Sequence, residues 1–213
     1  MAAQPVAPGV PARVAGTKLI EPTWLSERIA DMGISWGTGN SRVSGTLWWC
    51  MAASALIDPL VGAYAAGTPV PDSSLERLEC EMRPDGGIER IVAPVSAPEA
   101  DAGAALGQAL HGIVPVLAEV SGAGQPALWA IVADAIGNRA IDAGDPRAGM
   151  RLAAEVGGRL PAPRFVDIES RTFVRRISCC LVYEVSGCQM CTSCPKRPAA
   201  EREQLLTDLA HRG

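Results

Sequence analysis

Hydrophobic residues recur three and four positions apart over most of this chain, which is the spacing of amphipathic helices. The first such segment follows Pro22 and ends at Gly33. The next, residues 47–66, is apolar on nearly all sides, so it predicts a buried helix that is kinked or restarted at Asp58-Pro59. The same pattern predicts helices over residues 98–120, 126–143, 147–160 and 199–211.

Two stretches alternate apolar and charged residues with period two instead. Residues 75–82 and 88–92 flank the turn sequence Pro84-Asp-Gly-Gly, which predicts a β-hairpin. Residues 165–168 and 172–177 read as extended segments. The pattern therefore predicts a helix-rich α+β fold with a central hairpin and a C-terminal strand that leads into a cysteine-rich loop.

The division of the chain follows from the same pattern. Residues 1–16 mix Ala, Pro, Val and Gly without a basic segment followed by an apolar one, so we expect a flexible N-terminal tail and no signal sequence. We expect residues 17–178 to form a helix-rich scaffold that would bind the ligand, and residues 179–213 to form a C-terminal, cofactor-binding segment packed on it as one domain. The longest apolar run is interrupted at Asp58-Pro59, so no transmembrane segment is predicted.

Composition and charge narrow the class of protein. Hydrophobic residues make up 48% of 213, enough for a substantial core, and the formal net charge is -4. Residues 171–213 nevertheless carry seven Lys or Arg against four Asp or Glu, which suits an acidic partner but gives no indication of nucleic-acid binding. The chain shows no phosphate-binding loop, catalytic triad or dinucleotide fingerprint, so we expect no flavin or NAD site.

Five of the seven cysteines lie within residues 179–194. An odd number of cysteines without a signal sequence favours a reducing, cytoplasmic location in which thiolates bind metal. A zinc site usually has two Cys-x2-Cys pairs, whereas Cys179 and Cys180 are adjacent. Cys188, Cys191 and Cys194 resemble a [4Fe–4S] run only in part, because Pro195 follows the third cysteine. Two adjacent cysteines can bind a two-iron cluster more easily than a single ion, because the cluster is wider.

The spacing Cys179-Cys180-x10-Cys191-x2-Cys194 resembles the C-terminal signature of the FhuF-type ferric-siderophore reductases. The flanking residues 175–183 and Pro195 also fit. This resemblance implies a [2Fe–2S] cluster held by Cys179, Cys180, Cys191 and Cys194. Cys188 departs from the family pattern and is a candidate substitute ligand.

The resemblance also implies a function: transfer of one electron to Fe(III) in a hydroxamate-type siderophore, which releases Fe(II) in the cytoplasm. A ferredoxin or reductase would supply the electron, and a peripheral position at the inner face of the membrane is compatible with this role. No catalytic side chain is expected beyond the cluster. The alternative is a non-enzymatic iron–sulfur or zinc protein that acts as a redox sensor or siderophore-handling adaptor.

Arg175 and Arg176 precede the cysteine pair on a predicted strand, so their side chains should point to opposite faces. We expect at least one to face the cluster edge, and both are candidates for docking a substrate or partner.

Overall fold

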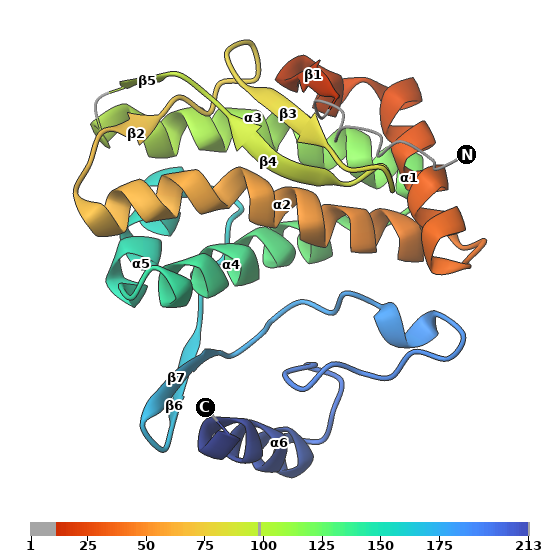
Figure 1. Ribbon diagram of the computed structural model, residues 1–213, viewed down its shortest axis with the longest axis vertical. Coiled ribbons are helices and arrows are strands. Elements are labelled where there is room, and N and C mark those ends of the chain that lie inside the picture. The colour runs from red at the N-terminus through yellow and green to blue at the C-terminus, as the bar shows by residue number, and fades with distance from the viewer. Residues whose placement is uncertain (1–11, 98, 213) are drawn as a thin grey trace, which may run out of the picture.

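The computed structural model describes residues 12–97 and 99–212 and shows an α+β fold, as predicted (Figure 1). The helices are α1 (Pro22–Trp36), α2 (Ser41–Ala66), α3 (Glu99–Ser121), α4 (Gln125–Asp142), α5 (Pro146–Val156) and α6 (Ala199–Arg212), with short 3-10 turns η1 (Gly16–Ile20) and η2 (Val182–Glu184). The strands are β1 (Arg13–Ala15), β2 (Val70–Pro71), β3 (Glu79–Met82), β4 (Ile88–Val92), β5 (Val95–Ala97), β6 (Phe165–Ile168) and β7 (Arg171–Val174).

Helix α2 is the centre of the core and packs against α1, α4 and β4. Its two adjacent indoles are buried, and each donates a hydrogen bond to a backbone carbonyl: Trp48 to Gly86 at 3.0 Å and Trp49 to Leu128 at 2.9 Å. These bonds satisfy the only polar atom of each ring and fix α2 against the hairpin and α4.

Of the kink or restart expected at Asp58-Pro59, the restart does not occur, because one helix runs from Ser41 to Ala66 with Pro59 inside it. Ile57 and Leu60, on either side of the Asp58-Pro59 peptide bond, are both buried in the core. Their burial favours a continuous helix over a break, despite the hydrogen bond that proline cannot donate.

In the part of the chain that the structure describes, three small antiparallel sheets accompany the helices. The largest has the strand order β1-β3-β4, and β3 and β4 form the predicted hairpin. Residues 13–15 belong to the predicted tail but pair with β3 as strand β1, because Arg13 forms a salt bridge of 2.6 Å with the buried carboxylate of Glu81. The predicted tail is therefore too long at this end, and residues 1–11 lie outside the described residues.

Among the described residues, two helical segments are long and apolar enough to cross a membrane by length and composition alone: Ser41–Ala66 and Ala102–Ser121. The fold buries 50% of the most apolar window of the first segment and 44% of that of the second. Core helices of a globular protein meet the same criterion, so the two segments are weak evidence for membrane insertion.

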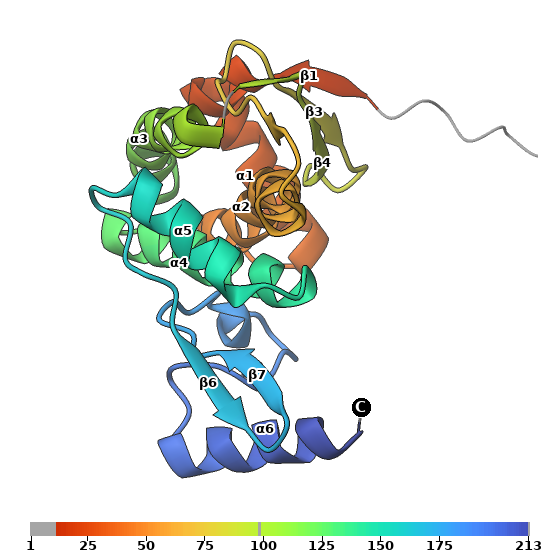
Figure 2. The ribbon, with the colours of Figure 1, turned by 90° about the vertical axis from the view of Figure 1, so that its left-hand side faces the viewer.

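The C-terminal part lies beneath the helical layer, on the side of α4 (Figures 1 and 2). It consists of the β6–β7 hairpin, an irregular segment that includes η2, and helix α6. Strand β7 contacts α4, and η2 contacts α2. The irregular segment between β7 and α6 therefore runs along the underside of the core, and it carries the cysteines.

Candidate iron–sulfur site

A buried carboxylate on α4 anchors the chain just before the cysteine pair. Asp134 accepts hydrogen bonds from the backbone N–H of Ile177 at 3.0 Å and from that of Ser178 at 2.9 Å. The Ser178 hydroxyl donates to the same carboxylate at 2.5 Å. Hydrogen bonds to a charged acceptor are stronger than neutral ones, so Asp134 holds residues 177 and 178 firmly against α4.

The strand that leads to the cysteines ends at Val174, so Cys179 and Cys180 do not alternate between two faces of a sheet. Directly after them, Leu181 has a φ of 62°, in the left-handed region, and the chain turns into η2. Among non-glycine residues this conformation is uncommon, and here it begins the turn that returns the chain toward Cys191 and Cys194.

The four cysteines of the predicted ligand set approach one another in two pairs. The sulfur atoms of Cys179 and Cys194 are 3.8 Å apart. Cys180 and Cys191 are hydrogen-bonded to each other. Arg197 closes the loop by donating to the Cys191 carbonyl at 2.9 Å. The structure thus brings together two residues from each end of the motif.

The hydrogen-bonded pair divides into a thiolate and a thiol. The hydrogen bond from Cys191 lowers the pKa of Cys180 to about 5, assisted by the Val182 backbone N–H and the Arg176 guanidinium. The same hydrogen bond, together with burial, raises the pKa of Cys191. Since thiolates are the form that binds metal, Cys180 is prepared for ligation at neutral pH.

The arrangement of the four cysteines distinguishes a site for a single metal ion from a site for a two-iron cluster. Among the described residues, no three His, Cys, Asp or Glu side chains come together closely enough to hold a single ion. A tetrahedral zinc site would gather all four sulfurs around one point, whereas two separate pairs suit a centre with two metal atoms. Four cysteine thiolates are also the usual ligands of a [2Fe–2S] cluster, so the residues present fit this group.

Residues 176–196 match the family model of the FhuF 2Fe-2S C-terminal domain. The cysteine segment carries this domain. The resemblance inferred from the cysteine spacing is confirmed for this segment, and the cofactor that the domain indicates is a [2Fe–2S] cluster. A search of curated proteins found no match to the chain.

Within the FhuF 2Fe-2S domain, Arg176 lies against one of the predicted ligands. Its Nη1 donates to the Cys191 sulfur at 3.4 Å, while Nε faces Asp134 and Nη2 faces Ser178, each at 3.5 Å. Only 16% of the side chain is exposed. Hydrogen bonds and charge near the sulfurs set the potential of an iron–sulfur centre, so Arg176 is placed to tune it.

Arg175 has different surroundings. It is exposed, and it lines a cavity between β6 and α6 together with Arg202 and Glu203. Its backbone N–H bonds to the Arg164 carbonyl at 2.8 Å, which continues the pairing of the two C-terminal strands. The two arginines therefore lie in separate environments, and their role in docking stays a prediction.

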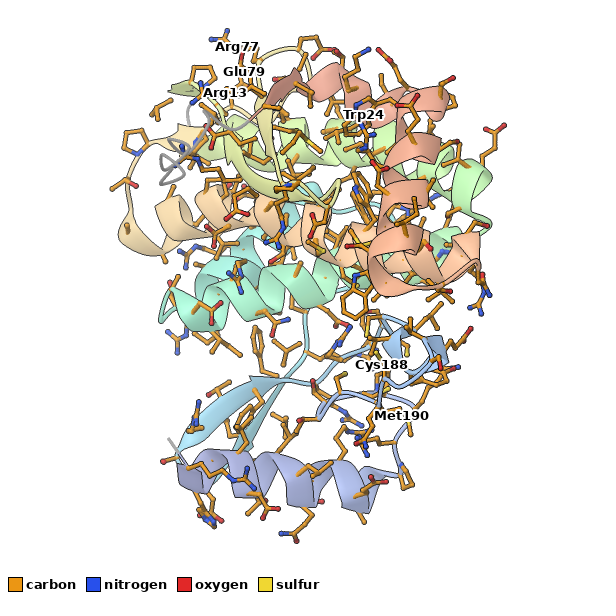
Figure 3. The ribbon with its side chains drawn as sticks, turned by 45° about the vertical axis from the view of Figure 1, so that its right-hand side comes forward. Arg13, Trp24, Arg77, Glu79, Cys188 and Met190 are labelled. Atoms are coloured by element: carbon orange, nitrogen blue, oxygen red, sulfur yellow. The ribbon has the colours of Figure 1, made fainter. Side chains whose placement is uncertain are left out.

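Cys188 lies on the loop between η2 and Cys191 (Figure 3). Its backbone N–H bonds to the Val185 carbonyl at 3.1 Å, and among the described residues no hydrogen bond joins its sulfur to another cysteine. The geometry therefore favours Cys191 and Cys194 over Cys188 as the ligands from this end of the motif.

Two residues near the site could not be recognised from the sequence. Asp134 lies inside an apolar helical pattern without any motif around it. Cys50 follows Trp48-Trp49 and reads as a core residue, yet it shares a cavity with Cys180. Burial raises the pKa of the Cys50 thiol to about 12, so it stays protonated beside the loop. No local sequence signal separates either residue from the core positions around it.

Proposed function

We propose that this protein is a ferric-siderophore reductase that works in the cytoplasm. The observation that carries the proposal is the FhuF 2Fe-2S C-terminal domain over residues 176–196. The convergence of Cys179 with Cys194 and of Cys180 with Cys191 supports it, because these are the ligands that the family signature implies.

The reaction is a transfer of a single electron. When bound, the [2Fe–2S] cluster supplies one electron, which a ferredoxin or reductase has delivered beforehand. The substrate is Fe(III) held by a siderophore of hydroxamate type, and it becomes Fe(II) in the same chelator. Hard oxygen donors bind Fe(II) much less tightly, so the iron is released without breaking a bond of the siderophore.

The contributions of the chain itself are binding and electrostatics. The cysteine thiolates hold the cluster at the surface of the helical core, where a substrate can approach. Asp134 fixes the backbone before Cys179, and Arg176 places a positive charge and a hydrogen bond at the Cys191 sulfur. A positive charge at this point stabilises the additional electron and raises the reduction potential.

The proposal is tested by mixing the anaerobically reduced protein with a ferric trihydroxamate such as ferrioxamine B and following the visible spectrum. We expect the oxidised spectrum to return upon addition of one equivalent. Protein that is reoxidised by air but stays reduced in excess ferric siderophore would exclude the reductase and favour a redox sensor.

A further inference from the structure

Helices α2 and α4 face each other through a row of polar residues that the apolar core does not require. On α2 the residues Cys50, Ser54 and Asp58 follow one another at intervals of four, so they lie on one side of the helix. On α4 the residues Asp134, Asn138 and Asp142 do the same. Asp134 is buried and Cys50 and Ser54 are half-buried, whereas the other three residues are exposed, so the two rows lead from solvent into the junction of the helices.

These rows line a cavity of about 260 Å³ that begins at the iron–sulfur domain. Cys180 and Arg176 line it together with Ser54, Asn138 and Arg139. A second cavity of about 420 Å³ shares Ser54 and Arg139 with the first and extends to β4. We call the two together the α2–α4 groove. Cavities of about 300–1,000 Å³ are typical of small-molecule sites, and the second cavity falls within that range.

One polar group in the groove is buried without a partner. The Arg139 Nε has no acceptor among the described residues, whereas buried polar groups are nearly always hydrogen-bonded in folded proteins. Ser54 is half-buried and Asn138 is exposed, and neither side chain bonds another described residue, so both are open to water in the free protein. A ligand with oxygen acceptors would satisfy Arg139 and would take the place of water on Ser54 and Asn138.

The charges in the groove are already paired within the protein. Arg139 forms ion pairs with Asp142 at 2.6 Å and with Asp58 at 3.4 Å. Asp134 is engaged by Arg176 and by the Ser178 backbone. The second cavity adds Arg83, Arg90 and Glu89, so the whole lining holds four arginines and four acidic residues. Because these charges balance, the groove suits a ligand of low net charge and not a polyanion.

We infer that the α2–α4 groove binds the ferric siderophore, with the iron-bearing end of the chelate toward Cys180 and its amide and hydroxamate groups along Ser54, Asn138 and Arg139. This inference rests on the proposed function and adds the location and charge class of the substrate. Cys180 is the one predicted cluster ligand that lines the groove, so it marks the shortest route for the electron.

The test measures binding of a redox-inert substrate analogue, the gallium(III) complex of desferrioxamine B, to the cluster-loaded protein by calorimetry. Asn138→Leu and Ser54→Leu place apolar side chains in the groove and should each weaken binding by about tenfold or more. Gln108→Leu makes a similar amide-to-apolar change on an exposed face of α3 and should leave the affinity unchanged. The visible spectrum of the cluster should be the same in all three.

If a leucine variant loses the cluster, Asn138→Ala and Ser54→Ala replace it, since they remove the polar group without filling space. Groove variants that bind the gallium complex as tightly as Gln108→Leu would overturn the inference, while wild-type reoxidation by ferrioxamine B would leave the proposed function intact. Tighter binding of a triply negative gallium tricatecholate complex would also overturn it. A wild-type protein that neither binds the gallium complex nor is reoxidised would reject the proposed function itself.

Discussion

The carboxylate of Asp134 on α4 accepts hydrogen bonds from both the backbone N–H and the hydroxyl of Ser178, although 44 residues separate the two in the chain. This link joins the helical core to the residue that directly precedes the cysteine pair. The iron–sulfur segment is therefore held in position by a residue outside the matched domain.

Replacing Asp134 by Asn should weaken this anchor, because one carboxylate oxygen becomes an amide that cannot accept a hydrogen bond. Leaving buried donors unpaired costs about 1–3 kcal/mol. We expect a loss of this size in the free energy of unfolding measured with urea, and a lower cluster content after purification. Asp208→Asn on α6, where the carboxylate accepts only a solvent-exposed hydrogen bond from Gln204, is the control. Equal stability and cluster content in both variants would contradict the anchoring role.

Replacing Arg176 by Gln should lower the reduction potential of the cluster, because the cation and the hydrogen bond at the Cys191 sulfur stabilise the additional electron. A tenfold change in the one-electron equilibrium corresponds to 59 mV, and we expect a shift of up to about this size. The measurement is a redox titration followed by electron paramagnetic resonance. An unchanged potential, with Arg175→Gln as the matched control, would show that Arg176 is only structural.

Arg175 is the exposed member of the pair, so docking of an acidic electron donor is expected to depend on it. Arg175→Ala should slow reduction by a ferredoxin at low ionic strength and flatten the dependence of the rate on salt. Stopped-flow kinetics over a range of salt concentrations measures both. Rates that match the wild type at every salt concentration would place the docking surface elsewhere.

The ligand assignment makes a separate prediction. Cys191→Ser and Cys194→Ser should lose or strongly alter the visible cluster spectrum, since a serine oxygen replaces a thiolate poorly. Cys188→Ser should keep the spectrum, because Cys188 is not a member of either cysteine pair. A colourless Cys188→Ser protein beside a coloured Cys179→Ser protein would favour Cys188 as a ligand in place of Cys179.

Much of the fold was predictable because helical periodicity is a local property. The ends of α1, α3 and α4 lie within a few residues of those expected from apolar spacing, and the hairpin of β3 and β4 follows from alternation and a turn sequence. The strand β1 was missed because three residues without alternation carry no local signal. Its stability comes from pairing with Glu79–Met82, more than sixty residues away.

In the candidate site, too, the features with a local sequence signal were predicted and those that depend on distant residues were not. The cysteine motif is compact in sequence, so its spacing carried the resemblance to the FhuF-type family, and that resemblance implied the cofactor. Asp134 was missed because its partners lie 42 to 44 residues further along the chain. The polar row Cys50, Ser54 and Asp58 is visible in the sequence, but it gains meaning only once α4 places a second polar row opposite it.

The central claim is most directly tested by the stoichiometry of iron reduction. The reduced, cluster-loaded protein is mixed without oxygen with excess ferrioxamine B in the presence of a ferrous-specific chelator, and the coloured Fe(II) complex is counted against the cluster content. A cluster that stores one electron predicts one Fe(II) per cluster, and none from the Cys191→Ser variant. No Fe(II) from the wild-type protein, or the same amount from the variant, would contradict the account.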